Sequence, residues 1–125
     1  MIKYSVVFVI NDLGQILGVS RKDDITKFGL PGGSIEINES SFEAAVRETL
    51  EETGIVISKM NFVYSDSETD CYLATNWSGE VQTQEIGIVK WLTVRDLIDH
   101  DSAFPEYNIT AIDCLKKFYP EIHLR

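Results

Sequence analysis

Three glutamates, Glu48, Glu51 and Glu52, are the residues whose type and spacing best suit chemistry. They lie in RETLEETG (47–54), which is typical of a helix that stops at a glycine. At 100° per residue their side chains fall within an arc of about 100° on one side of that helix. Carboxylates this close repel at a cost of order 1 kcal/mol. Oxygen ligands of this kind are what Mg²⁺ prefers, so a bound divalent cation would relieve the repulsion.

Much of the negative charge of the chain lies around this helix. The net charge is −9, and residues 33–55 hold six glutamates against a single arginine. This window therefore accounts for five of the nine surplus charges. Binding to nucleic acid or to an anionic membrane depends on lysine and arginine, so the composition argues against both partners.

The segments before the helix predict strands that position it. Residues 2–10 read as a strand and 15–20 as a second one, joined by a turn at 11–14 into a hairpin. The first strand is apolar at every position from Val6 to Ile10, which is typical of a strand with both faces covered by helices. Residues 21–27 form a polar loop, and FGLPGG (28–33) predicts a tight, glycine-rich turn.

Capping signals set the predicted helices. Ser40 and Glu43 form a capping box for a helix that runs to about Thr53, with Gly54 as its stop. Later elements are predicted as strands 61–65, 70–75 and 85–93, a turn at 76–79, a short helix through 98, and a last helix from Pro105 to before Pro120. The fold class is thus α/β, with a mixed β-sheet sandwiched between helices in a single domain over residues 1–125.

Residues from Gly33 to Gly54 stand in the order G-x5-E-x7-R-E-x-x-E-E-x-G. This pattern resembles the signature of the Nudix hydrolases, which cleave compounds in which a nucleoside diphosphate is linked to another moiety. Seven common residues would fall into this order by chance in on the order of one window in 10⁸, so the resemblance is specific. Thr49 departs from the family pattern, which usually has an aliphatic residue there, and we expect its side chain to face the sheet.

The resemblance implies roles for the matching positions. Glu48, Glu51 and Glu52, together with the backbone carbonyl of Gly33, are implied as ligands of Mg²⁺, with Mn²⁺ as a substitute. One of the carboxylates is further implied to activate or orient the attacking water. Arg47 is implied to hold the geometry of the glutamates rather than the substrate. The same family has an α/β/α sandwich fold, which agrees with the elements predicted above.

Further candidates lie outside the helix, and each has an alternative. Glu39 fits the family pattern as an outer partner of the ligands or as a stabiliser of its loop. Glu85 is a candidate extra metal ligand or catalytic base, or else an exposed residue at a strand end. Arg21 and Lys27 flank the glycine-rich turn and could meet phosphates, although a solvated loop explains them equally well. Tyr72 is a candidate substrate contact, because it lies about seventeen residues beyond the motif, where subclasses that cleave diadenosine polyphosphates often carry a tyrosine.

The leading hypothesis is a magnesium-dependent pyrophosphohydrolase. It would cleave a phosphoanhydride of a nucleoside triphosphate, or of a related nucleoside diphosphate derivative, by water attack on phosphorus. Within the same class, the alternative is a dinucleoside polyphosphate or ADP-ribose hydrolase. A catalytically inactive module that senses a nucleotide is the alternative outside it, but degenerate modules tend to lose a glutamate and this chain keeps all three.

The remaining composition favours a cytosolic protein with a small-molecule partner. The longest uncharged apolar run, residues 4–11, is shorter than the eighteen or so residues that span a bilayer, and no basic segment or cleavage site accompanies it. Cys71 and Cys114 stand in no metal-ligand or redox spacing, so we expect reduced thiols. Small enzymes commonly form symmetric dimers, and a homodimer is one assembly that the sequence allows.

Overall fold

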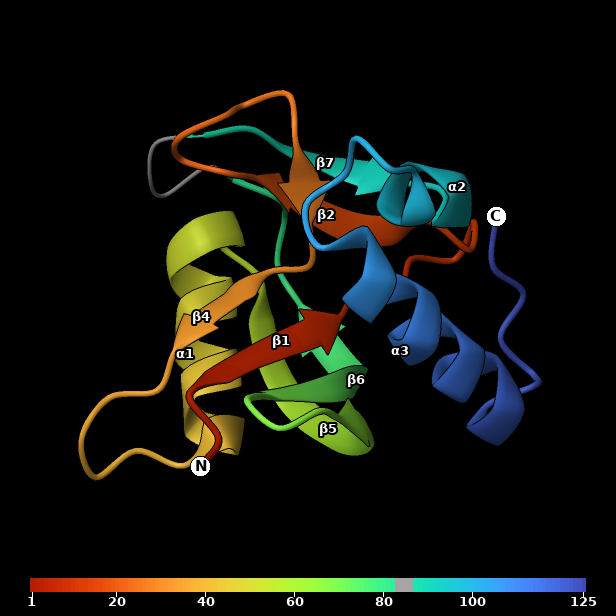
Figure 1. Cartoon of the computed structure of the whole chain (residues 1–125). Coiled ribbons are helices and arrows are strands. Elements are labelled where there is room, and N and C mark those ends of the chain that lie inside the picture. The colour runs from red at the N-terminus through yellow and green to blue at the C-terminus, as the bar shows by residue number, and fades with distance from the viewer. Residues whose placement is uncertain (83–86) are drawn as a thin grey trace.

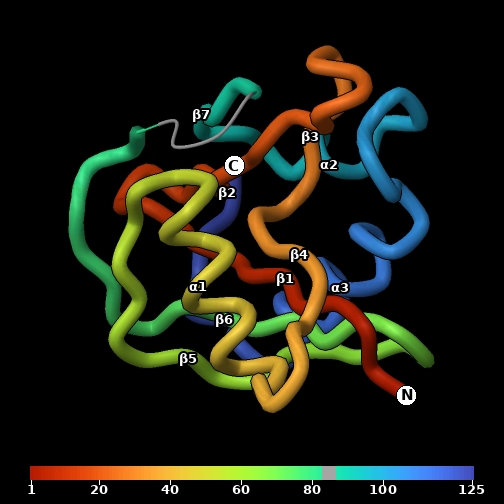
Figure 2. The backbone as a smooth tube through the Cα atoms, turned by 90° about the vertical axis from the view of Figure 1, so that its left-hand side faces the viewer, coloured from red at the N-terminus to blue at the C-terminus, as the bar shows by residue number. Residues whose placement is uncertain are grey.

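The computed structural model of the chain describes residues 1–82 and 87–125. Its β-sheets lie between helices, which confirms the predicted α/β class. Helix α1 (Ser41–Thr53) covers one side, and helix α3 (Pro105–Phe118) covers the other, as Figures 1 and 2 show from two directions. The short helix α2 (Val94–Ile98) precedes α3. None of the helices in these ranges is both long and apolar enough to cross a membrane.

The first sheet is mixed and has the strand order β4-β1-β6-β5. Strand β1 (Tyr4–Phe8) pairs antiparallel with β4 (Gly32–Ser34) and parallel with β6 (Thr69–Ser78). Strand β6 pairs antiparallel with β5 (Val56–Ser65). Both edges of β1 are therefore occupied by strands that come later in the chain.

The second sheet is antiparallel, with the order β3-β2-β7. It consists of β3 (Phe28–Gly29), β2 (Ile16–Ser20) and β7 (Val89–Leu92). The predicted hairpin between residues 2–10 and 15–20 forms only next to its turn, and it does not extend further because β2 belongs to a different sheet from β1. A single bridge between Ile10 and Ile16 joins the two segments next to the turn. The strands separate beyond it because β4 and β6 already use both edges of β1.

The core lies on both faces of the sheets, as the apolar strand predicted. Val7 and Val9 pack in one buried cluster with Ala45 of α1. Phe8 points the other way, into a second cluster that contains Leu115 of α3. Neighbouring side chains on a strand point to opposite faces, so a strand buried on both faces must be apolar at every position.

The later strands differ from the prediction mainly in length. Strands β5 and β6 extend beyond the predicted 61–65 and 70–75, and β6 continues through most of the predicted turn at 76–79. Trp77 pairs with a residue of β5, and its ring lies 6.0 Å from that of Trp91. The chain turns only at Gly79, which has a φ of +99°. The predicted strand 85–93 is observed as β7, while residues 85 and 86 lie outside the described ranges.

Candidate active site

Local signals fix both ends of helix α1. The Ser40 hydroxyl accepts a hydrogen bond of 3.0 Å from the backbone N–H of Glu43, and the Glu43 carboxylate accepts one of 3.0 Å from the Ser40 N–H. Gly54 ends the helix with a φ of +79°, and its N–H donates to the Leu50 carbonyl at 2.9 Å. The predicted capping box and glycine stop are confirmed, and they fix where the helix begins and ends.

The buried side of α1 decides where its carboxylates point. The fully buried residues of the helix are Ala44, Ala45, Thr49 and Thr53. These small side chains pack against the sheet, so the acidic ridge, which we define as Glu48, Glu51 and Glu52, lies outside that contact, with Glu48 and Glu52 against strand β4. Thr49 faces the sheet as predicted, and the departure from the family pattern therefore affects packing and leaves the ridge intact.

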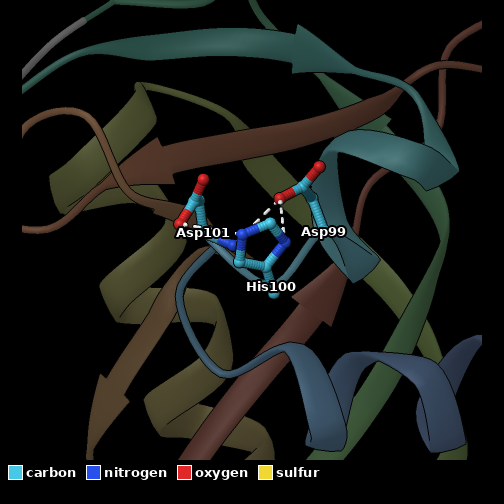
Figure 3. A group of neighbouring side chains, drawn as sticks. All are labelled: Asp99, His100 and Asp101. Carbon is cyan, nitrogen blue, oxygen red and sulfur yellow. Dashed lines mark hydrogen bonds and ion pairs between the residues drawn. The ribbon is translucent and has the colours of Figure 1, made fainter.

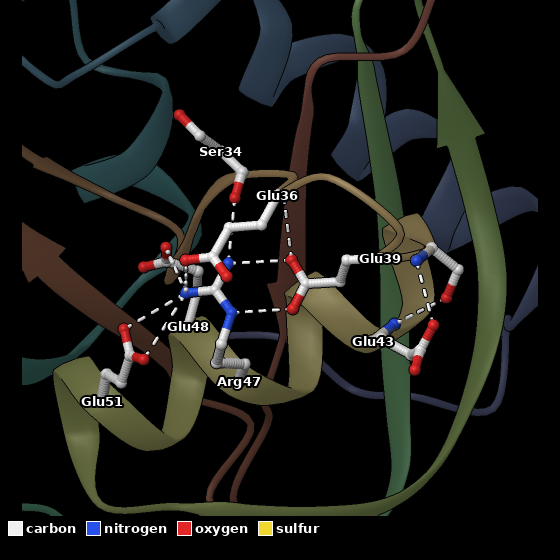
Figure 4. Close-up of polar contacts among 8 residues, drawn as sticks. Ser34, Glu36, Glu39, Glu43, Arg47, Glu48 and Glu51 are labelled. Atoms are coloured by element: carbon white, nitrogen blue, oxygen red, sulfur yellow. Dashed lines mark hydrogen bonds and ion pairs between the residues drawn. The ribbon is translucent and has the colours of Figure 1, made fainter.

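Arg47 is the centre of a network that joins the ridge to the loop after β4 (Figure 4). Its Nε donates to Glu39 Oε2 at 2.7 Å, and its Nη2 donates to Glu39 Oε1 at 2.9 Å, a two-pronged pair. Its Nη1 donates to Glu48 Oε1 at 3.0 Å and lies 3.3 Å from Glu51 Oε2. Its Nη2 also donates to the Ser34 carbonyl at 3.0 Å. One arginine thus fixes two ridge carboxylates relative to the backbone.

The network shifts the ionisation of its members. Hydrogen bonds from Arg47 lower the pKa of Glu39 to about 2, assisted by the backbone N–H of Glu36. The same bonds to Glu39, followed by those to Glu48, raise the pKa of the Arg47 guanidinium. Glu39 is therefore ionised at neutral pH and bound to Arg47. Glu39 also accepts a hydrogen bond of 3.0 Å from the N–H of Glu36, which agrees with a loop-stabilising role, while its role as an outer partner of metal ligands stays a prediction.

Two glycines allow the ridge to lie against strand β4. A methyl group on Gly33 would lie 2.6 Å from Glu48 Cδ, so the carboxylate rests where only glycine leaves room. The N–H of Gly32 donates to Glu52 Oε1 at 2.7 Å. Gly32 has a φ of +149°, and a methyl group on it would lie 2.0 Å from the Ser5 carbonyl oxygen. Glycine at position 33 thus makes room for the Glu48 side chain. Glycine at position 32 is required by the backbone conformation and by the neighbouring strand.

The donor chemistry of the ridge suits a divalent cation. The carboxylates are hard oxygen donors, and the cradle at Gly33 brings Glu48 onto the backbone. The Glu48 side chain is 17% exposed and that of Glu51 is 45% exposed, so the ridge runs from a sheltered end to an open one. Each carboxylate can accept about four contacts, so the bonds to Arg47 and Gly32 are compatible with metal ligation.

A second group of ligand atoms lies after helix α2. Atoms of Asp99, His100 and Asp101 lie within 4.8 Å of one another (Figure 3). His100 Nδ1 is 3.3 Å from Asp99 Oδ1, and His100 Nε2 is 3.5 Å from Asp101 Oδ1. All three are exposed and consecutive in sequence, so their proximity needs no bound ion.

Of the other predicted residues, the structure describes Arg21, Lys27 and Tyr72, and the ion pair of Arg21 and the hydroxyl contact of Tyr72 are both made away from Arg47. Arg21 forms a two-pronged ion pair with Asp23, and Lys27 is half-buried in the same loop. Tyr72 packs under the first turn of α1, where its hydroxyl lies 2.6 Å from Ser41 Oγ. Glu85 lies outside the described residues. The roles of all these residues in binding and catalysis stay predictions.

Sequence reasoning missed the backbone partners of the network. The Ser34 carbonyl and the Gly32 N–H each hold a member of the motif. Backbone groups carry no side-chain signal, so only the three-dimensional arrangement reveals them. Glu36 was also missed. It lies 3.6 Å from Arg47 Nη1, and its position in the acidic window was the signal that could have found it.

Comparison with known proteins agrees with the site. The sequence pattern that defines the NUDIX domain matches residues 2–111. An 8-oxo-dGTP diphosphatase of Buchnera aphidicola (subsp. Acyrthosiphon pisum) is 33% identical over 104 residues, which cover 77% of this chain and 81% of that protein. An ADP-ribose pyrophosphatase of Methanocaldococcus jannaschii is 39% identical over 66 residues, which cover 50% of this chain and 39% of that protein.

A solved MutT structure, from an analysis of the Aliivibrio salmonicida and Vibrio cholerae proteins, superposes with a TM-score of 0.73. Its sequence is 28% identical, and the match covers 94% of this chain and 98% of that one. The domain match extends well beyond the motif and includes both sheets and the first half of α3. The chain therefore belongs to the Nudix family, whose members are hydrolases of phosphoanhydride bonds in nucleotides.

Proposed function

We propose that this chain is a divalent-cation-dependent pyrophosphohydrolase that converts a nucleoside triphosphate into the monophosphate and pyrophosphate. The observation that carries the proposal is the acidic ridge, ordered by Arg47 and set against Gly33. The similarity to an 8-oxo-dGTP diphosphatase over most of both chains supports a triphosphate substrate.

In this proposal Glu48, Glu51, Glu52 and the Gly33 carbonyl hold Mg²⁺, and Mn²⁺ substitutes for it because it takes the same oxygen ligands. The bound cation supplies charge neutralisation at the phosphates and helps to activate water. One ridge carboxylate accepts a proton from the attacking water, whose oxygen forms a bond to phosphorus while the bond to the leaving pyrophosphate oxygen breaks. Arg47 keeps the carboxylates in place through its bonds to Glu39 and Ser34.

The test is a substrate panel with Mg²⁺ and identified products. It should contain canonical and oxidised nucleoside triphosphates, ADP-ribose and a dinucleoside polyphosphate. The variants are Glu51→Gln and Glu52→Gln, with Asp113→Asn, an exposed carboxylate of α3, as the matched control. We expect both ridge variants to lose most of the activity and to bind Mn²⁺ more weakly in calorimetry, while the control keeps both properties. Full activity in both ridge variants would refute the metal assignment.

ADP-ribose is the second candidate substrate. It is favoured by the partial similarity to an ADP-ribose pyrophosphatase, which covers 39% of that protein. Cleavage of ADP-ribose to AMP and ribose 5-phosphate, faster than cleavage of any triphosphate, would favour it. A dinucleoside polyphosphate substrate has less support, because the Tyr72 hydroxyl is already bonded to Ser41 and the ring packs against Phe42 and Phe62. Nucleotide binding without cleavage of any panel member would favour a sensor.

A further inference from the structure

Strand β5 leaves a long edge of the first sheet open. It spans ten residues and lies at the end of the strand order β4-β1-β6-β5 (Figure 1). Among the described residues, only β6 pairs with it. The other outer strands of the two sheets, β4, β3 and β7, have three, two and four residues. The backbone N–H and C=O groups of an open edge can pair with a further strand, and of the described edges β5 offers the most of them.

This edge has little of the protection that open edges usually carry. Proteins commonly block such edges with proline, with several charged side chains or with a very short strand. The sequence VISKMNFVYS (56–65) contains no proline and one charged residue, Lys59. Register shifts interrupt the pairing with β6 before residue 60 and after residue 62, but residues 60–62 pair regularly. The middle of the strand is therefore a regular and uncharged edge.

Exposed aromatic side chains lie beside the middle of β5. Phe62 is 55% exposed, and Phe42 in the first turn of α1 is 41% exposed. Both rings contact Tyr72 of β6, with ring centres 6.0 Å and 5.7 Å from it. We call these three residues the aromatic patch. Exposed hydrophobic surface next to an open sheet edge is typical of a contact with another protein chain.

Charge favours a second copy of this chain as the partner. The net charge of −9 makes two copies repel each other over most of their surfaces. The β5 edge is an exception, because its one charge is the positive Lys59 near its start, and the next charged residue is Asp66, just after its end. In an antiparallel pair of identical strands, the start of each strand lies beside the end of the other. Lys59 of each copy then comes close to Asp66 of the other, which gives two complementary charge pairs.

We propose that two copies of this chain form a dimer through antiparallel pairing of their β5 strands, with Phe62 on the two-fold axis. The two aromatic patches then meet on the side of the joined sheet that α1 covers. A pair of ten-residue strands forms up to about ten backbone hydrogen bonds, which is typical of a protein–protein interface. A two-fold contact of this kind uses the same edge on both copies, so association stops at the dimer.

The dimer leaves the acidic ridge accessible. Glu48 and Glu52 of the ridge lie against β4, which is at the opposite end of the strand order from β5. Three strand spacings of about 4.8 Å separate these two strands, or about 14 Å. The inference is therefore independent of the proposed function, and its test needs no substrate.

Light scattering and sedimentation measure the dimer directly. At sub-millimolar concentrations we expect the parent to have twice the monomer mass of 14.1 kDa, with a return to 14.1 kDa on dilution. Phe62→Glu brings two like charges together on the axis and should weaken dimerisation by roughly 100-fold or more. Phe118→Glu is the matched control, because Phe118 is a 59% exposed phenylalanine of α3, and it should dimerise like the parent. A parent that stays monomeric, a mass above that of a dimer, or an unchanged dimer in Phe62→Glu would each overturn the proposal.

A second variant separates association from folding. Lys59 is exposed, so Lys59→Glu should keep the fold and the melting temperature of the dilute, monomeric parent. It should dimerise less than the parent, because attraction between residue 59 and Asp66 becomes repulsion, and added salt should reduce this difference. Dimerisation of Lys59→Glu equal to that of the parent at low salt would overturn the antiparallel arrangement.

A disulfide tests which residue lies on the axis. Directly opposed residues of an antiparallel pair have Cα atoms about 4.5 or 5.5 Å apart, which a disulfide can span. Treatment with oxidised glutathione should therefore convert most of Phe62→Cys into a covalent dimer that a thiol reductant separates. The parent, whose Cys71 is buried, and Phe118→Cys should stay largely uncoupled under the same conditions. Equal yields of covalent dimer from Phe62→Cys and Phe118→Cys would overturn the proposal.

Discussion

Replacing Gly33 by alanine tests whether Glu48 acts from the position that the structure gives it. The added methyl group would lie 2.6 Å from Glu48 Cδ and 2.8 Å from each carboxylate oxygen. Atoms that are not bonded to each other do not approach so closely, so the carboxylate must leave the cradle. The end of a glutamate side chain is flexible, and the move breaks its 3.0 Å ion pair with Arg47. We expect a loss of about 1 kcal/mol in the free energy of unfolding.

The expected effect on activity is much larger. If Glu48 ligates the cation beside Gly33, displacing it should lower metal affinity and kcat/KM by roughly 10- to 100-fold. Steady-state hydrolysis over a range of Mg²⁺ concentrations would measure the loss, and calorimetric titration with Mn²⁺ would measure the affinity directly. Part of the activity should return at high Mg²⁺ concentration, because the remaining ligands still bind the cation weakly.

The neighbouring Gly32→Ala variant is the matched control for stability. Its methyl group would lie 2.0 Å from the Ser5 carbonyl oxygen and 2.7 Å from Val6 Cα, and its φ is +149°. Backbone atoms of a paired strand cannot move aside, so we expect a loss of about 3 kcal/mol or more and a fall of on the order of 10 °C in melting temperature. Parental metal affinity in Gly33→Ala would refute the assignment of Glu48. Equal losses of stability in both variants would refute the claim that the Glu48 side chain moves away from the methyl group added in Gly33→Ala.

Arg47→Lys should lower kcat/KM by roughly 10- to 100-fold in a steady-state assay, because one ammonium group cannot replace the paired bonds to Glu39 and the third to Glu48. Glu39→Gln should lower the melting temperature at pH 7. The difference from the parent should shrink as the pH falls from about 4.5 to about 2, because the Glu39 pKa is lowered to about 2 and its stabilisation disappears as it is protonated. Ser40→Ala should cost about 1 kcal/mol in urea unfolding, since it removes one bond of the capping box. Glu85→Gln should lower kcat by about two orders of magnitude if Glu85 is the catalytic base, and an unchanged kcat would reject that role.

Helix α1 was predictable because its signals are local. Ser40, Glu43 and Gly54 act within a turn of their own positions, and the structure uses all three as predicted. The same holds for α2, where the Thr93 hydroxyl accepts from the Asp96 N–H at 3.3 Å. Caps and stops satisfy backbone groups a few residues away, so one sequence is enough to read them.

Strand pairing was less predictable because it is decided at a distance. The short strand β4 has the sequence GGS, which has no strand propensity of its own, and it becomes a strand because β1 pairs with it. That pairing, together with the parallel one to β6, removes the edge of β1 on which the predicted hairpin depended. A turn signal at 11–14 shows that the chain reverses, but it does not show which edges are still available.

The site shows the same division between local and distant information. The motif spacing identified Arg47 and the glutamates, because all of them act through side chains at fixed intervals. It did not reveal that Gly32 donates to Glu52, nor that Ser34 accepts from Arg47, since backbone groups look alike in every sequence.

The repulsion between the carboxylates of the acidic ridge is smaller in the fold than the isolated helix sequence implies. Considered alone, the helix brings like charges together at a cost of order 1 kcal/mol. In the fold, Arg47 contacts Glu48 and Glu51 and is held in turn by Glu39 and Ser34, so a positive charge lies beside two carboxylates that would otherwise repel each other. Ligands that are already in place lose less conformational entropy when a metal binds. Arg47 therefore offsets the repulsion on this helix face and holds two carboxylates in place for the cation that we propose, which gives a physical reason for the arginine to stand in the same short motif as the glutamates.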